Sequence, residues 1–480
     1  MPLKEMGLPG ISRPELQRIH TASLQLLEQT GLRIDHAAAL DRLADAGAQV
    51  DRTTNRVRFP AVLVERCLAE VPRTMRLAGR EAQFDHVLRR ESDFRVRCLS
   101  GPNWMLAEKE GALRPATLQD QEQLAIVCDA LADIDFAGLL SIQDVPPPLA
   151  DLYAAKTLLQ HSRKHFMSLS LGAKNMRYLA EMQLAVCGGR RAMRRRPLFH
   201  TIVCPISPLY YPADEIERLL VCARYKMPVK AAIEIMLGTS APVTLAGTIA
   251  QGNAEVLGAL TLIYILYPEN PAVYYCFPSL TDMRTGSAVG GGPENMLLYA
   301  ALSQLGRRWY QLPTEGPGLV ADGVDPAQCL FQKGVGALTA AAAGTTLLSG
   351  AGGLKREAAS GLSQLVIDDE IIRFVRRMAQ GFAVSDEKIG LDAVQRTGPQ
   401  GHYLADNHTM AHFREELRFF SAAFDFEAGE ERFHDPDRLR QRARARADTI
   451  LRTHEVPPLS DAVIRELDTI LASAQKEIMG

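Results

Sequence analysis

Apolar residues recur at helical spacing along the first part of the chain. Ser12, with Glu15 three positions later, predicts a capping box, and Gly31 is typical of the residue that ends a helix. The elements expected next are a helix near residues 36–46, a small hairpin at 50–58 and a helix that opens at Pro60. We therefore predict that residues 1–130 form a helical N-terminal cap with a small β hairpin.

Farther along, short apolar runs alternate with longer amphipathic stretches, a pattern typical of repeated βαβ units. Proline and acidic residues begin several of the helices, as at Pro212, Pro242, Pro293 and Pro326. The predicted strands are Phe136–Ile142, Phe166–Leu171, Leu198–Val203, Val229–Ile235, Ala272–Phe277, Arg308–Leu312 and Thr345–Leu348.

Seven such strands favour an α/β fold of the (β/α)8 TIM-type barrel class over residues 131–405, with an eighth strand near Tyr403. A doubly wound sheet is the alternative, but no Gly-x-Gly-x-x-Gly follows the first strand. Residues 406–480 are predicted to form a C-terminal helical segment.

Composition narrows the functional classes. The chain is 47% hydrophobic and 23% charged with a formal net charge of −2, which gives no overall attraction to nucleic acid or to an anionic membrane. Residues Met1–Gly10 lack the apolar run of a secretory signal, and the uncharged stretch Val335–Leu354 is interpreted as helix, turn and strand. Eight scattered cysteines without a CxxC pair indicate reduced thiols in a cytoplasmic protein.

Two arginine-rich stretches are interpreted as surface rather than as nucleic-acid-binding patches, because the total charge is balanced. The helix near 438–453 is expected to face solvent or another subunit, and the run before Pro197 is expected to be a surface loop. The arginines concerned are Arg440, Arg442, Arg444 and Arg446 in the first stretch, and Arg190, Arg191, Arg194, Arg195 and Arg196 in the second.

In a barrel of this class, reactive groups follow the carboxyl ends of the strands. This rule selects six candidate substrate-binding residues, two of them aromatic side chains that could contribute to a cation–π cage: Trp104, Gln143, Glu234, Phe277, Arg284 and Asp322. No certain catalytic residue is predicted.

Two of the six have competing interpretations. Glu234 lies in an apolar strand, so it either pairs with a buried cation in the wall or faces a cationic ligand in the mouth. Arg284 either binds a substrate carboxylate as a bidentate fork or forms a loop ion pair with Asp282.

Metal and nucleotide sites are not predicted. His408 and His412 share an i, i+4 spacing without nearby cysteines, which is typical of a structural pair. Gly290-Gly-Gly-Pro precedes a helix and is either an anion-binding nest or, as we expect, a hinge. No Gly-Lys-Ser/Thr phosphate loop occurs.

Several motifs, taken in order along the chain, resemble the trimethylamine methyltransferase family, including its non-pyrrolysine, glycine-betaine-type branch. The longest is the run from Gly238 (Gly-Thr-Ser-Ala-Pro-Val-Thr-Leu-Ala-Gly), followed by Asn253-Ala-Glu. Others begin at Gly47, Val57, Arg114, Asp282, Gly292, Gln364, Gly401 and His408. Together they span nearly the whole chain.

The resemblance implies transfer of a methyl group from a small methylated amine to the cobalt(I) corrinoid (cobalamin) of a partner protein. We expect no tightly bound cofactor or metal, no nucleic acid or membrane partner, and a homo-oligomer. The family's carboxylate and lysine pattern is altered in the stretch from Ala321 to Lys333, and the chain has no pyrrolysine, so a quaternary amine is expected rather than trimethylamine. The alternatives are a non-catalytic betaine-binding protein and a metal-assisted lyase.

Overall fold

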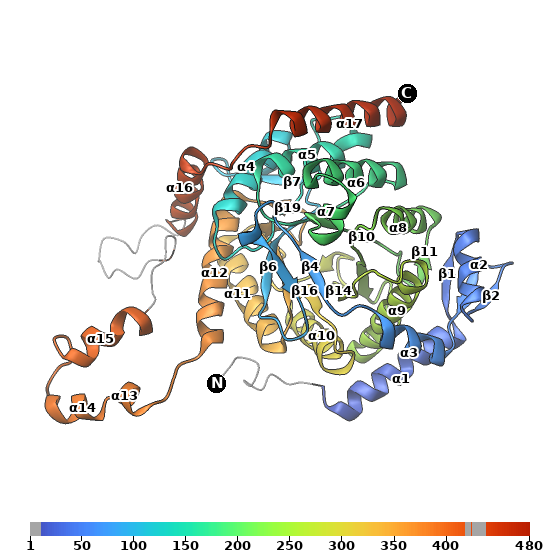
Figure 1. The fold of residues 1–480 in the computed structure, drawn as a ribbon. Coiled ribbons are helices and arrows are strands. Elements are labelled where there is room, and N and C mark those ends of the chain that lie inside the picture. Colours follow the sequence, from blue (N-terminus) through green and yellow to red (C-terminus); the bar gives the residue numbers. More distant parts are fainter. Residues whose placement is uncertain (1–10, 418–423, 425–437) are drawn as a thin grey trace.

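The computed structural model describes residues 11–417, 424 and 438–480 (Figure 1). Its first elements are helices and a small sheet, and the capping box of Ser12 and Glu15 at the start of α1 is confirmed. The helices are α1 (Arg13–Gln29), α2 (Ala37–Asp45) and α3 (Ala61–Glu70). The sheet has the order β11-β1-β3-β2, with β1 (Leu32–Ile34), β2 (Gln49–Asp51), β3 (Arg56–Arg58) and β11 (Tyr210–Tyr211).

Parallel strands form the centre of this α/β fold. One sheet has the order β12-β10-β9 and a second has the order β13-β14-β16-β17-β6. Single parallel bridges at Phe136 and Ala137 connect β6 to β9, and only Ala232 separates β12 from β13. The strands are β6 (Arg95–Cys98), β9 (Phe166–Ser168), β10 (Phe199–Val203), β12 (Val229–Ala231), β13 (Ile233–Leu237), β14 (Tyr274–Thr281), β16 (Thr314–Pro317) and β17 (Leu347–Ala351).

Helices follow the strands and pack outside them (Figure 1). By length and composition, α9 alone among the described helices is apolar enough to cross a membrane, but 78% of its most apolar window is buried inside the protein. The helices are α4 (Leu118–Ala130), α5 (Ala150–His161), α6 (Ala173–Cys187), α7 (Arg190–Arg195), α8 (Ala213–Tyr225), α9 (Leu245–Leu266), α10 (Pro293–Gln304), α11 (Pro326–Ala343) and α12 (Leu362–Gln380).

Two predicted strands are wrong. Residues Leu305–Trp309 form a π-helical turn instead of a strand, and the strand begins later, at Thr314 in β16. Tyr403 lies in a non-strand segment between two helices. The parallel strand that the pattern missed is β6, whose sequence Arg-Val-Arg-Cys lacks an apolar run because a buried ion pair, not a hydrophobic side chain, occupies position 97.

A hairpin and a four-stranded sheet lie at opposite ends of the parallel strands. The hairpin, β4 (Met75–Leu77) with β5 (His86–Leu88), lies at their amino ends, where Ala78 N donates to Pro197 O over 3.1 Å. A sheet of order β18-β19-β7-β8 lies at the opposite, carboxyl end of β17. Its strands are β7 (Trp104–Ala107), β8 (Ala112–Pro115), β18 (Gly353–Leu354) and β19 (Ala359–Ser360).

Beyond α12, an arm of three short helices extends away from the body (Figure 1). These are α13 (Asp386–Ile389), α14 (Leu391–Thr397) and α15 (Asn407–Glu416). The chain returns as α16 (Arg438–Thr453), whose buried Ala443, Ala447 and Ile450 share one face, and as α17 (Asp461–Met479). The alternating arginines of α16 therefore accompany an ordinary packed helix.

A buried ion pair joins α11 to α12. Lys333 Nζ lies 2.6 Å from Asp368 Oδ2, and both side chains have no exposed surface. Asp368 also accepts hydrogen bonds from Gly352 N and from Gln364. The lysine of the altered stretch is thus part of the packing between two helices.

Replacing Lys333 by Met should destabilise the fold strongly, because it leaves the Asp368 carboxylate buried without its cation. Removal of one partner of such a pair costs about 3–5 kcal/mol, which urea unfolding followed by circular dichroism would measure. Lys476→Met, on the exposed face of α17, is the matched control. A loss for Lys333→Met no larger than for the control would contradict the role given to this pair.

Candidate active site

Glu234 lies on β13 at the level where this strand pairs with Phe277 of β14. Water reaches its side chain, yet surrounding protein atoms desolvate the carboxyl group and raise its pKa. Across the described residues, Glu234 has neither a hydrogen bond nor an ion pair within 4 Å. A charged group held in this way at the carboxyl side of parallel strands is available to a cationic ligand.

A strained turn between β18 and β19 faces the same region. Lys355, Arg356 and Glu357 all have positive φ angles, of 48°, 49° and 66°. Consecutive non-glycine residues in the left-handed region are costly, and such strain is concentrated at functional sites. The turn is anchored by Arg356 N, which donates to Ala321 O over 2.7 Å.

The strained turn presents one cation and one carboxylate. Arg356 Nη1 donates to Ser279 Oγ on β14 at 2.9 Å, and the described chain provides no carboxylate within ion-pair distance of its guanidinium. Burial raises the pKa of Glu357 to about 7, and the nearby charge of Glu234 adds to this rise. Arg356 in turn lowers the pKa of Glu234. The three charged groups are therefore close enough to influence one another.

Below them, a buried ion network links three strands. Arg97 Nε on β6 lies 2.7 Å from Glu315 Oε1 on β16, and Lys230 Nζ on β12 contacts Glu315 Oε2. Burial alone would favour neutral Glu315, but Lys230 and Arg97 outweigh it and lower its pKa. Burial lowers the pKa of Lys230 to about 8, so the amine stays charged at neutral pH.

Asp322 organises a glycine loop next to Arg356. Its carboxylate accepts from Gly290 N at 2.7 Å and from Gly291 N at 3.0 Å, so the glycines form the nest that was the alternative to the expected hinge, and the protein's own side chain occupies it. A Cβ on Gly290 would lie 3.1 Å from Arg356 Cγ, which shows how closely the loop packs on this arginine. Asp322 therefore supports Arg356 through the loop.

The remaining predicted residues lie in three different environments. Trp104, 38% exposed, starts β7 and pairs with Ala359, two residues beyond Glu357. Gln143 Nε2 donates to Asn103 O at 2.6 Å and so holds the residue before Trp104. Phe277 is buried and packs on Tyr299 with ring centroids 6.1 Å apart.

Arg284 forms the loop ion pair that was the alternative interpretation. Its guanidinium makes two 3.0 Å hydrogen bonds to Asp282, and its side chain is 88% exposed. The guanidinium whose charge lowers the pKa of Glu234 most belongs to Arg356, which the sequence analysis missed. The only signal for it was the Lys-Arg-Glu run between two glycine-rich strand segments, and that run also suits an ordinary surface turn.

Metal ligation finds no support in the described part of the chain, where no group of three or more His, Cys, Asp or Glu side chains is arranged to hold an ion. His408 and His412 pack edge to face with ring centroids 4.6 Å apart.

Together, Glu234, Arg356 and Glu357 at the carboxyl ends of the strands can bind and orient a charged small molecule.

Comparison with solved structures first defines the class of fold. The crystal structure of the Methanosarcina barkeri monomethylamine methyltransferase (MtmB) matches with a TM-score of 0.55 and 11% identity, covering 97% of this chain and 86% of that one. At this identity the likeness shows a shared fold.

Sequence comparison then identifies the family. The model of the family described as trimethylamine methyltransferase (MTTB) matches residues 8–479. Trimethylamine methyltransferase MttB of Desulfitobacterium hafniense (strain DSM 10664 / DCB-2) is 31% identical, over 98% of this chain and 95% of that protein. Glycine betaine methyltransferase of D. hafniense (strain Y51) is 26% identical, over 98% and 97% of the two chains. The chain belongs to the trimethylamine methyltransferase (MTTB) family, as its motifs indicated.

Glu357 should make cation binding dependent on pH. With a pKa of about 7 the carboxyl group is mostly neutral at pH 6 and mostly ionised at pH 8, so a probe cation such as tetramethylammonium should bind more tightly at pH 8. Calorimetric titration of wild-type protein, Glu357→Gln and the exposed control Glu28→Gln would measure this. Glu357→Gln should flatten the pH dependence, and an unchanged dependence in that variant would assign the titration to another group.

Proposed function

We propose that this protein transfers a methyl group from a quaternary, betaine-like amine to the cobalt(I) corrinoid of a partner protein. The observation that carries the proposal is the combination of Glu234 and Glu357 with the guanidinium of Arg356 at the carboxyl ends of the strands. A betaine has one quaternary ammonium and one carboxylate. Two carboxylates and one arginine without a carboxylate partner match that charge distribution.

The arginine favours a betaine over trimethylamine, which has no carboxylate for it to bind. The names of relatives include both substrates. The chain consists of standard residues only, whereas the resemblance implies a pyrrolysine for trimethylamine chemistry. Both observations support the glycine-betaine branch.

We further infer that the parallel strands close into a (β/α)8 barrel. Pairing runs from β6 through the bridges at Phe136 and Ala137 to β9, β10 and β12, and from β13 through β14, β16 and β17 back to β6. The backbone continues from β12 to β13 through Ala232 alone. In a closed barrel, Glu234, Arg356 and Glu357 would border a single mouth. The barrel would then start at β6 rather than at residue 131.

The reaction needs orientation more than acid–base chemistry. The electron pair of cobalt(I) forms the new carbon–cobalt bond, the carbon–nitrogen bond breaks, and its electron pair stays on nitrogen as a neutral tertiary amine. No proton moves. Positive charge on nitrogen fades in the transition state, so a site that binds the cation too strongly would slow transfer. Partly protonated Glu357 moderates that attraction, while Arg356 fixes the other end of the substrate.

The proposal includes a partner and an assembly. A corrinoid protein would have to present its cobalt at the carboxyl ends of the strands, because the charged groups face that side.

We propose a homo-oligomer because the arm exposes large apolar side chains, including Phe382, Val384 and Leu404, each at least 73% exposed. All eight cysteines are free thiols, which supports a cytoplasmic location.

Methyl transfer should depend on cobalt(I) and on a quaternary amine. Mixing the protein with reduced cobalamin, free or on its cognate protein, should convert the cobalt(I) absorption spectrum to that of methylcobalt(III) with glycine betaine or a related substrate. Trimethylamine and S-adenosylmethionine should give no conversion. Binding of a betaine without conversion, across a panel of quaternary amines and with the partner present, would favour the non-catalytic binding protein. Activity lost on chelation and restored by zinc would favour the metal-assisted lyase.

Arg356 should bind the substrate carboxylate, and Arg284 should not. A charge-assisted hydrogen bond is worth about 1.5–3 kcal/mol, so Arg356→Ala should weaken glycine betaine binding roughly ten- to hundred-fold. Tetramethylammonium, which has no carboxylate, should be nearly unaffected. Arg284→Ala is the matched control, because it removes the same group from the exposed loop. Equal losses on both ligands in Arg356→Ala would make Arg356 structural, and a betaine-selective loss in Arg284→Ala would restore the original assignment.

A further inference from the structure

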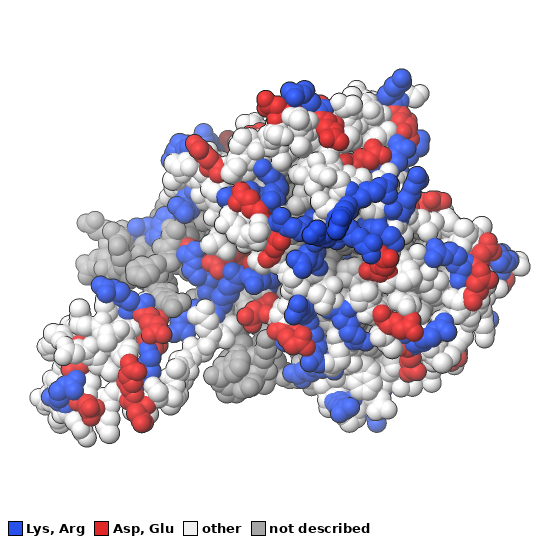
Figure 2. Space-filling model, in the orientation of Figure 1, with Lys and Arg blue, Asp and Glu red and all other residues white. Residues whose placement is uncertain are grey.

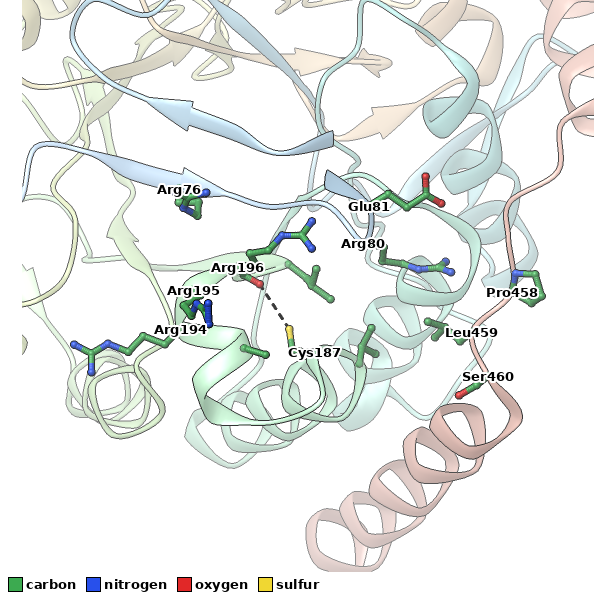
Figure 3. A pocket seen from close by; sticks show the side chains of 13 residues that line it. Arg76, Arg80, Glu81, Cys187, Arg194, Arg195, Arg196, Pro458, Leu459 and Ser460 are labelled. Carbon is green, nitrogen blue, oxygen red and sulfur yellow. Dashed lines mark hydrogen bonds between the residues drawn. The ribbon is translucent and has the colours of Figure 1, made fainter. Parts of the chain in front are cut away.

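A cavity lies at the amino ends of the strands, opposite to Glu234 and the strained turn. It has a volume of about 920 Å³, and five of its lining residues are arginines: Arg76, Arg80, Arg194, Arg195 and Arg196 (Figure 3). Arg80 N donates to Arg163 O just before β9, and Pro197, just before β10, accepts from Ala78 N. We call this cavity the arginine pocket. Nothing in the proposed methyl transfer uses it.

The positive charge of the arginine pocket is only partly neutralised. Arg194 pairs with Glu269 at 3.1 Å, and Arg196 makes a fork with Asp85 at 2.9 and 2.8 Å. The side chains of Arg76 and Arg195 have no hydrogen bond or ion pair to any residue that the structure describes. Figure 2 shows Lys and Arg side chains gathered on the face that carries α7.

Arg80 adds a half-buried guanidinium without a carboxylate partner. Its amino groups donate to the carbonyls of Leu159, Gln160 and Pro457, and burial lowers its pKa. The carboxylate of the pocket, Glu81, has a partner in Arg163 at 3.8 Å and accepts from Gln83. Gathering arginines in a recess costs free energy unless an anion supplies the counter-charge.

The lining residues also indicate which kind of anion the pocket fits. Guanidinium forks match phosphate oxygens, and three guanidiniums without carboxylate partners suit a ligand with several phosphates. The lining also contains the apolar side chains of Val186, Leu198, Pro458 and Leu459. The volume lies in the range of small-ligand sites, about 300–1,000 Å³. A ligand that combines phosphates with a less polar body would contact both kinds of lining side chain.

We propose that the arginine pocket binds a nucleoside di- or triphosphate or a chemically similar phosphate-bearing ligand. Arg76 and Arg195 contact the phosphates, Arg80 supplies a fixed positive charge, and the apolar lining side chains contact the base. Arg80 also holds the segment before α17 through Pro457, so its substitution would disturb the fold as well as the pocket. Arg76 and Arg195 are exposed and lack such structural contacts.

The test is calorimetric titration of the full-length protein with ATP, inorganic tripolyphosphate and adenosine at physiological salt. ATP should bind saturably with one site per chain, tripolyphosphate more weakly, and adenosine hardly at all. Bound ATP should also raise the thermal midpoint. Arg195→Ala should weaken ATP binding roughly ten-fold or more. Arg191→Ala, four residues earlier on α7 and outside the pocket lining, should leave binding unchanged.

Specific outcomes would overturn the proposal. Absence of saturable binding by both ATP and tripolyphosphate would do so, as would adenosine binding as tightly as ATP. Equal losses in Arg191→Ala and Arg195→Ala would indicate general surface charge. Tight binding of a single-stranded oligonucleotide without competition by ATP would indicate a nucleic-acid surface instead. Arg76→Ala provides a second variant, and both pocket variants should retain the wild-type thermal midpoint without ligand. None of these outcomes depends on the methyltransferase assay.

Discussion

The buried network of Arg97, Glu315 and Lys230 is the interaction on which the arrangement of the strands depends. It places two cations and one carboxylate among β6, β16 and β12, where hydrophobic side chains would otherwise pack. Removing one partner of such a network leaves an uncompensated charge in a low-dielectric interior, at a cost of about 3–5 kcal/mol. The network therefore holds the three strands in one register. This register in turn fixes the positions of the charged groups at their carboxyl ends.

Above the network, the charged side chains are not paired with one another. Glu234 has no partner within ion-pair distance in the described structure, Arg356 has only a serine, and Glu357 has a pKa raised to about 7. Desolvated charges of this kind cost stability. The left-handed turn at residues 355–357 adds backbone strain, and this conformation directs Arg356 and Glu357 toward the strands.

Much of the fold could be predicted from pattern. The capping box of Ser12, the helix–turn–strand reading of Val335–Leu354 and the parallel strands at Leu198–Val203 and Val229–Ile235 follow from local spacing, which the structure confirms. The strand at Arg95–Cys98 could not be predicted, because a charged residue such as Arg97 interrupts the apolar pattern of a buried strand. Its burial depends on the ion pair with Glu315, which is 218 residues away in the sequence. Of the candidate site, Glu234 was identified by its contrast with neighbouring apolar residues.

The sequence by itself determined the family, the α/β class, and the presence of a carboxylate in an apolar strand, because motif order and periodicity are local properties of the chain. Tertiary structure alone decided which charges meet. Arg284 and Arg356 are the same residue type in similar loops, yet one forks onto Asp282 and the other donates to Ser279 and lowers the pKa of Glu234. Likewise, the prediction of a surface loop before Pro197 was wrong: Arg190–Arg195 form helix α7, and residues 194–196 line a cavity with Arg76 and Arg80, more than a hundred positions earlier. Coulombic interactions depend on distance in space, and distance in space is set by the fold.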